Sequence, residues 1–377
     1  MGGFECADHI NRSGERINLQ RETHHDIRVA EDYGALKRLG ISVVREGVCW
    51  SEVEVKPFVF DFSRLLPFFK AAREYKIQII WDLCHFGYPD DLIPTHPKFV
   101  VRFVSFCKQF LQFHLQHSRE RPWLVPINEI SFLSWHSGDM RGTVPFAVNS
   151  GWDIKYHLCR AKIEAIKAIK AMEPSTVVMA VEPLVKIHAA DEMIDPLHLE
   201  EINTYQYQAM DIVLGRQCAE LGGDESFVDV LGFNYYYNNQ WTNLNVILPW
   251  PDLEKKHIPL SKLLKEAYSR YKKPIILTET GHFGKDRDIW LEEISFECKK
   301  ALESEIDLRG ICIYPVIDRP DWDNLQSYCN CGIWDLDISK NRIPFLPYLK
   351  TLSECQQLFN KKQDMGATRL EMLLMKN

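Results

Sequence analysis

The sequence lacks several features that mark whole classes of protein. Its 377 residues contain no uninterrupted apolar run of the about 18 residues that a membrane-spanning helix needs. The first residues do not show the charged-then-apolar pattern of a secretory signal. No run of five like charges occurs and the net charge is −7, so neither nucleic acid nor a membrane is an expected partner. We expect a cytoplasmic protein of undetermined oligomeric state.

The cysteines and histidines also lack the spacings of metal or redox sites. The cysteine count is 11, and no Cys-x-x-Cys pair occurs. Cysteines inside apolar runs, such as Cys107 and Cys312, are typical of small buried side chains in a cytosolic protein. Cys329 and Cys331 stand one residue apart, and their redox role is left open. No His-Glu-x-x-His spacing appears either, so we expect no metal and no cofactor.

No Gly-x-Gly-x-x-Gly or Walker loop follows the first β-rich run, which disfavours a doubly wound nucleotide-binding sheet. Short β-rich runs instead alternate with longer amphipathic stretches, as in parallel βα units. The predicted strands are residues 2–8, 43–50, 77–83, 124–127, 177–181, 228–234, 275–278 and 310–317. The predicted helices are residues 25–39, 62–75, 97–117, 152–173, 197–215, 260–271, 287–303 and 345–359. This order predicts a single-domain (β/α)8 TIM barrel over residues 1–360, with a frayed tail at 361–377.

In such a barrel the residues just after the strands line the catalytic face. Two carboxylates stand at such positions, because Glu129 follows the apolar run 124–127 and Glu279 follows the run 275–277. Glycoside hydrolysis needs one carboxylic acid to protonate the leaving oxygen, and one carboxylate to attack the anomeric carbon or to activate water. A separation of about 5–5.5 Å gives retention and about 6.5–9.5 Å gives inversion, and the sequence alone does not give that distance.

Other strand ends supply side chains that suit the same chemistry, namely Arg45, Asn128, Tyr236 and Trp322. Arg45 could keep Glu279 ionised, and Tyr236 could donate a hydrogen bond to it. Asn128 could bind a sugar hydroxyl, and Trp322 could stack on a sugar face. Each of these has an ordinary structural explanation when taken alone, and their occurrence together favours a site. Glu46 and Glu182 also end strands, and we expect them to be structural.

Several segments together resemble glycoside hydrolase family 1, the β-glucosidase-like enzymes of a clan of barrels with catalytic Glu residues on strands four and seven. The resemblance runs in order along nearly the whole chain, through residues 36–54, 85–89, 128–129, 231–236, 274–281 and 309–333. Asn128-Glu129 is similar to the acid/base motif Asn-Glu-Pro, and Thr278-Glu279-Thr280-Gly281 to the nucleophile motif Thr-Glu-Asn-Gly. The resemblance implies a retaining β-glycosidase with Glu129 as acid/base, Glu279 as nucleophile, and Tyr236 in contact with the nucleophile.

The same resemblance implies a set of substrate-binding residues: His9, His85, Asn234, Tyr314, Asp321 and Trp322. The sequence departs from the family at several of them. His9 stands where the family has a glutamine, Tyr314 where it has a tryptophan, and Asp321 where it has a glutamate. Phe86-Gly87 replaces Trp-Asp, Ile130 replaces the proline after the acid/base, and the chain is shorter than usual.

These departures fall mostly on sugar recognition and spare both carboxylates, so we expect the chemistry to be kept and the sugar to be open. Glucose is the default, and another hexose, a furanose or a modified sugar fits equally. No basic pair follows strand eight, which disfavours a 6-phosphoglycoside. Three classes remain: a retaining hydrolase or transglycosidase, another barrel hydrolase of the clan acting on a polysaccharide, and a sugar-binding pseudoenzyme. In each, the partner is a carbohydrate.

Overall fold

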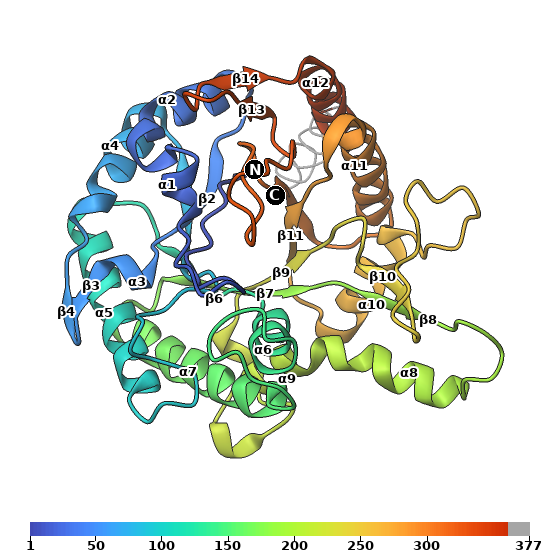
Figure 1. Cartoon of the computed structure of the whole chain (residues 1–377), viewed down its shortest axis with the longest axis horizontal. Coiled ribbons are helices and arrows are strands. Elements are labelled where there is room, and N and C mark those ends of the chain that lie inside the picture. Colours follow the sequence, from blue (N-terminus) through green and yellow to red (C-terminus); the bar gives the residue numbers. More distant parts are fainter. Residues whose placement is uncertain (361–377) are drawn as a thin grey trace, which may run out of the picture.

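The computed structural model describes residues 1–360 and contains a closed barrel of eight parallel strands (Figure 1). In order around the barrel they are β1 (Gly2–Gly3), β12 (Leu308–Ile313), β11 (Ile275–Thr280), β9 (Val230–Asn234), β7 (Val177–Pro183), β6 (Trp123–Ile127), β5 (Gln78–Cys84) and β2 (Val43–Gly47). The single-domain (β/α)8 prediction is confirmed. The predicted tail at residues 361–377 lies outside the described residues, and the domain boundary at 360 stays a prediction.

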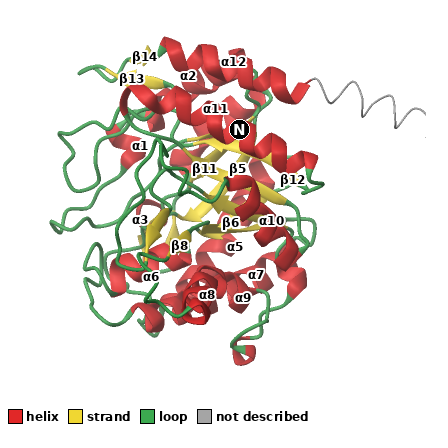
Figure 2. Ribbon diagram, turned by 90° about the vertical axis from the view of Figure 1, so that its right-hand side faces the viewer, coloured by secondary structure: helices red, strands yellow, loops and turns green. Residues whose placement is uncertain are grey.

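Helices surround the barrel, and the long loops gather at one side of the molecule, on the left in Figure 2. The helices are α1 (Leu19–Glu22), α2 (His25–Arg38), α3 (Trp50–Val53), α4 (Leu66–Tyr75), α5 (Phe99–His117), α6 (Ile130–Gly138), α7 (Gly151–Met172), α8 (Pro196–Thr204), α9 (Gln208–Val213), α10 (Leu260–Tyr271), α11 (Arg287–Glu303) and α12 (Leu346–Asn360). The helix predicted at 197–215 is thus two helices, α8 and α9, joined by a 3-10 turn at Tyr205–Tyr207. None of the helices in residues 1–360 is long and apolar enough to cross a membrane.

Three small two-stranded sheets decorate the barrel, and none of them was predicted. They are the antiparallel pairs β3 (Glu54–Lys56) with β4 (Val59–Phe60) and β13 (Trp334–Leu336) with β14 (Arg342–Pro344), and the parallel pair β8 (Lys186–His188) with β10 (Gln240–Thr242). Each is short, so the alternation of apolar and polar residues that marks a strand has little length in which to show.

Four strands are shorter than predicted. β2 ends at Gly47 rather than at residue 50, and β9 begins at Val230 rather than at residue 228. The other two, β1 and β12, end early for reasons that the structure shows. After β1, the Glu5 carboxylate accepts the N–H groups of Cys6 and Ala7, and this local turn takes the chain out of the barrel ladder at Gly3 rather than at residue 8. After β12, Pro315 has no N–H to donate, and the strand ends at Ile313 rather than at residue 317. Both of these early ends lie at the carboxyl ends of the strands.

Apolar side chains fill the barrel and the layer between barrel and helices. Inside the barrel, a cluster of buried residues comprises Ile80, Val125, Val177, Met179, Val181, Val230 and Ile276. At Gly3 an added Cβ would lie 2.3 Å from the Tyr314 ring, so only glycine lets that aromatic side chain pack beside β1. The packed interior therefore leaves room for chemistry only at the strand ends.

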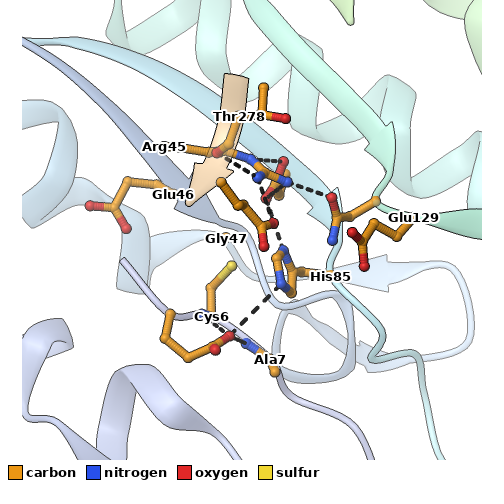
Figure 3. Close-up of polar contacts among 12 residues, drawn as sticks. Cys6, Ala7, Arg45, Glu46, Gly47, His85, Glu129 and Thr278 are labelled. Carbon is orange, nitrogen blue, oxygen red and sulfur yellow. Dashed lines mark hydrogen bonds and ion pairs between the residues drawn. The ribbon is translucent and has the colours of Figure 1, made fainter. Parts of the chain in front are cut away.

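Strand alternation separates Arg45 from Glu46. Arg45 points into the barrel, and Glu46 points away from it (Figure 3), where it contacts His25 and accepts a hydrogen bond from Tyr33. Glu182 accepts the N–H groups of Ile130 and Ser131 at the start of α6. The structure thus gives Glu46 and Glu182 the structural roles expected of them.

Candidate active site

Glu129 and Glu279 emerge at the same end of the barrel. Glu279 lies within β11 near its end, and Glu129 stands two residues after the end of β6, directly before α6. Asn234, which pairs with Glu279 in the ladder between β9 and β11, donates a hydrogen bond of 2.9 Å from Nδ2 to Glu129 Oε1. Thr278 donates to the other end of the same amide, at 2.7 Å. One buried asparagine therefore ties the acidic side chain on one side of the barrel to the strand that carries the other.

Arg45 joins the same two regions from β2. Its Nη1 donates to Glu279 Oε1 at 2.6 Å, and its Nη2 donates to Asn128 Oδ1, also at 2.6 Å. The guanidinium also pairs with Asp82, with Nη2 at 2.8 Å from Oδ2 and Nε at 3.1 Å from Oδ1. Arg45 and Asp82 are fully buried. The cation expected beside Glu279 is present, and Asp82 fixes its orientation.

Tyr236 completes the surroundings of Glu279. Its hydroxyl donates to Glu279 Oε2 at 2.7 Å, while Oε1 accepts from Arg45. Burial raises the pKa of Tyr236 well above its ordinary value, and the neighbouring Glu279 raises it further. The phenol therefore keeps its proton and remains a donor. With one partner on each oxygen, the Glu279 carboxylate is held in a single orientation.

Glu129 has a different environment. Burial, followed by the charge of Glu279, raises its pKa well above the ordinary value, and the hydrogen bond from Asn234 opposes this only in part. Its backbone is left-handed, with φ 42° and ψ 63°, a conformation that a residue with a side chain seldom adopts. Such strain often accompanies functional positions. Glu129 is thus a carboxyl group whose surroundings favour the protonated form, and the neighbouring Glu279 is ion-paired with Arg45.

His85 lies between two acidic residues (Figure 3). Its Nδ1 is 2.9 Å from Asp82 Oδ2, and its Nε2 is 3.8 Å from Glu5 Oε1. Burial favours the neutral ring, but the contact with Asp82 and the charges of Glu279 and Glu5 outweigh it and raise the pKa of His85. Tyr314 lies alongside, with its hydroxyl 3.3 Å from His85 Nε2 and 3.2 Å from Glu5 Oε1. The predicted residues His85 and Tyr314 therefore belong to one network with Asp82 and Glu5.

Glu5 and Arg319 are residues that sequence reasoning missed. Arg319 Nε lies 3.1 Å from Glu5 Oε2, and both side chains are largely buried. The predicted first strand ran to residue 8, so Glu5 was placed within it rather than just beyond its end. The local turn that ends β1 at Gly3 shows Glu5 to be a strand-end residue like the others. Arg319 follows Asp318 in the loop after β12, where a single arginine gave no signal by itself.

His9 and Trp322 pack against each other. Their ring centroids are 4.7 Å apart, and both rings also lie near Phe86 and His136. Burial lowers the pKa of His9 to about 3, so its ring is neutral at physiological pH. Asp321 is exposed, and its Oδ1 accepts the N–H groups of Asp323 and Asn324 within its own loop. The structure thus brings His9 and Trp322 together and places Asp321 on the outside.

Several buried polar atoms of this region lack a partner among the described residues. They include Asn128 Nδ2, His9 Nδ1 and Trp322 Nε1. Buried polar groups are nearly always hydrogen-bonded, and leaving one unpaired costs roughly 1–3 kcal/mol. Three such atoms on residues singled out from the sequence suit a ligand rich in hydroxyl groups.

Cys6, Asp82 and His85 place potential metal-binding atoms within 4.8 Å of one another. Arg45 and His85 already occupy the oxygens of Asp82. A guanidinium 2.8 Å from the same carboxylate repels a metal cation. This group is therefore better suited to an ion-pair network than to a metal.

Comparison with known proteins supports the fold of this chain and does not establish an activity. No family model matches the sequence, and no curated protein matches it. Among solved structures, a β-glucosidase from Thermotoga maritima in complex with deoxynojirimycin is similar, with a TM-score of 0.74 and 15% identity over 89% of this chain and 88% of that chain. The family 1 β-glucosidase from Thermotoga maritima gives a TM-score of 0.72 and 16% identity over 88% of this chain and 86% of that chain. The resemblance stated from the sequence is thus confirmed for the fold.

Proposed function

We propose that this chain is a retaining β-glycosidase that removes a terminal β-linked sugar, with Glu279 as nucleophile and Glu129 as acid/base. The observation that carries the proposal is the contrast between the two side chains. Arg45 and Tyr236 each donate to one oxygen of Glu279, whereas burial and the charge of Glu279 raise the pKa of Glu129. An oriented carboxyl group with a donor on each oxygen, beside a second carboxyl group with a raised pKa, is the pair that a retaining glycosidase uses.

The proposed reaction uses this difference between Glu279 and Glu129. Glu279 attacks the anomeric carbon, the bond from that carbon to the leaving oxygen breaks, and Glu129 gives its proton to that oxygen. In the second step Glu129 takes a proton from water, the water oxygen bonds to the anomeric carbon, and Glu279 leaves as a carboxylate. Arg45 and Tyr236 stabilise the free carboxylate of Glu279 before the first step and after the second. They interact with it less strongly while it is esterified to the sugar.

We assign roles to the remaining residues according to which of their polar atoms have no hydrogen-bond partner among the described residues. Asn128 Nδ2 and Trp322 Nε1 are the donors offered to sugar hydroxyls, and His9 Nδ1 can donate or accept according to its tautomer. His85 is the fourth residue that we assign to the sugar. The side chain of Asn234 is hydrogen-bonded to Glu129 and Thr278, so we assign it to positioning Glu129. The hydroxyl of Tyr314 contacts Glu5 and His85, so we assign it to positioning His85. Asp321 keeps Oδ2 for an outer hydroxyl or for the leaving group.

The charges of the site favour an uncharged sugar. Arg45 is matched by Asp82 and Glu279, His85 by Asp82, and Arg319 by Glu5. A sugar phosphate or uronate would bring a negative charge to a region whose cations already have partners. We therefore propose a neutral glycone such as glucose or another simple sugar.

Glu129→Gln tests the acid/base role. The variant should lose only a few-fold in kcat/KM with a dinitrophenyl β-glycoside, whose leaving group needs no proton, measured where glycosylation limits the rate. With a poor leaving group such as an alkyl alcohol it should lose about 10²–10⁴-fold. Steady-state kinetics with a leaving-group series measures this. An equal loss across the series would mean that Glu129 does not act as the acid.

The pH dependence of kcat/KM gives a second test. Glu129 must be protonated to act, and its raised pKa keeps the proton on it above the ordinary carboxyl range. Activity should therefore persist above that range and fall as the pH rises through the pKa of Glu129. Because a dinitrophenyl leaving group needs no proton, the wild type should show a smaller alkaline fall with that substrate than with an alkyl glycoside, and Glu129→Gln should show none from this group. If the variant kept the same alkaline fall, another group would be responsible for it.

A further inference from the structure

The loop after β12 carries two cysteines one residue apart, Cys329 and Cys331, and the first of them contacts Arg319. Among the described residues, Cys218 and Cys329 are half-buried, and the other nine of the 11 cysteines are buried. Cys329 Sγ accepts a hydrogen bond from Arg319 Nη1 at 3.7 Å. Cys329 is therefore a partly accessible thiol in direct contact with a cation.

Cys331 has the opposite character. Its Sγ donates to Asp318 Oδ1 at 3.5 Å, and its backbone N–H donates to the same oxygen at 3.2 Å. Asn330 alone separates Cys331 from Cys329 along the chain. Cys331 is thus a buried thiol that donates to Asp318, two residues along the chain from Cys329.

The backbone holds this arrangement in place. Cys329 N–H donates to the carbonyl of Arg319 at 3.0 Å. Asn330, between the two cysteines, is left-handed with φ 51°, and its carbonyl accepts hydrogen bonds from Gly284 N–H and from Arg287. A left-handed residue between two cysteines turns the chain sharply there, and the anchored carbonyl keeps the turn fixed.

The charges around Cys329 favour its ionised form. The adjacent Cys331 thiol and then the charge of Arg319 lower the pKa of Cys329, against burial and the carboxylates Asp318 and Asp321. Cys331 shows the reverse, because its contact with Cys329 and its burial raise its pKa well above the ordinary value. The surroundings therefore favour the thiolate form of Cys329 and the thiol form of Cys331.

We propose that Cys329 and Cys331 form a peroxide-reactive pair, with Cys329 as the attacking thiolate and Cys331 as the resolving thiol. The Cys329 sulfur bonds to one oxygen of a hydroperoxide, the O–O bond breaks, and the leaving oxygen takes up a proton to become water or an alcohol. The Cys331 sulfur then bonds to the Cys329 sulfenic sulfur, the S–O bond breaks, and the departing hydroxyl takes the thiol proton as water. The two sulfurs lose two electrons in total, and these reduce the peroxide.

Cys218 provides a matched comparison within the same chain. It is half-buried like Cys329, but its charged neighbour is Glu220, and burial and that carboxylate raise its pKa. If exposure alone controlled reactivity, Cys218 and Cys329 would react alike. The proposal requires Cys329 to react at least about tenfold faster, because thiolate content controls the rate.

The experiment uses the full chain, reduced and then treated with equimolar hydrogen peroxide, with peptide mass spectrometry as the readout. In the wild-type chain we expect a disulfide between Cys329 and Cys331, reversed by a thiol reductant. In Cys331→Ser we expect a sulfenic acid on Cys329 that dimedone captures. In Cys329→Ser, Cys331 should stay a free thiol, and Cys218→Ser should behave as the wild type.

Competitive alkylation of the untreated protein with iodoacetamide then compares Cys329 with Cys218, and Arg319→Met should remove most of the difference. Equal labelling of the two cysteines, or peroxide oxidation that spares Cys329, would overturn the proposal. The readout is thiol chemistry, so this result is independent of whether the chain hydrolyses glycosides.

Discussion

Replacing Glu279 by alanine is expected to lower kcat/KM for an activated aryl β-glycoside by about 10⁴-fold or more, because the variant has no group to form the glycosyl ester. The carboxylate removed is the one that Arg45 and Tyr236 hold. The measurement is phenol release across a panel of aryl β-glycosides that differ in the sugar, and the wild type identifies the accepted sugar.

Azide distinguishes a lost nucleophile from a damaged site. In Glu279→Ala the cavity left by the side chain admits azide, which should restore turnover and give an α-glycosyl azide. Glu297→Gln serves as the matched control, since Glu297 is also a buried glutamate but pairs with Lys300 and Ser261 away from the site. It should keep near wild-type activity. Equal losses in both variants, without azide rescue, would contradict the assignment of Glu279.

Replacing Arg45 by methionine is expected to destabilise the fold by about 3–5 kcal/mol and to remove activity. The change leaves Asp82 and Glu279 as buried carboxylates without their shared cation, and breaking a buried ion pair on one side costs about that much. Urea denaturation measures the free energy of unfolding. Lysine at this position keeps the charge but cannot reach Asp82, Asn128 and Glu279 together, so Arg45→Lys should recover more stability than activity.

Arg309 supplies the comparison for that stability change. It also lies on a barrel strand, but it pairs with Asp307 at the exposed, opposite end of the barrel. Exposed ion pairs contribute about 0–1 kcal/mol, so Arg309→Met should leave the free energy of unfolding nearly unchanged. If Arg45→Met cost no more than Arg309→Met, the buried network would not be the organising feature of the site.

The barrel could be predicted from the sequence because its signals are local and repeated. Buried parallel strands such as β5 appear as continuous apolar runs, and helices such as α7 show a long apolar stripe. Once eight such units were counted, the strand ends identified Glu129, Glu279 and Arg45 without any distance. What joins these residues is the closure of the barrel, which brings β2, β6 and β11 to one rim.

The rest depended on turns that the apolar pattern does not encode. Residues 2–8 are apolar enough for a strand, but the Glu5 side chain binds the next two amides and ends the strand early. Because this early end of β1 was not predicted, Glu5 was not recognised as a strand-end residue, and its ion pair with Arg319 was missed. Asp321 was matched by sequence position to a sugar-binding residue, whereas its place is set by a loop turn that only the structure shows.

Trapping of the covalent intermediate tests the central claim most directly. The wild-type chain would be incubated with a panel of 2-deoxy-2-fluoro β-glycosides that carry a dinitrophenyl leaving group, and the adduct mapped by peptide mass spectrometry. The account predicts one sugar per chain, attached to Glu279, with the accepted member of the panel naming the glycone. An adduct on another carboxylate, or hydrolysis of the parent sugars with no adduct from any fluoro analogue, would contradict it.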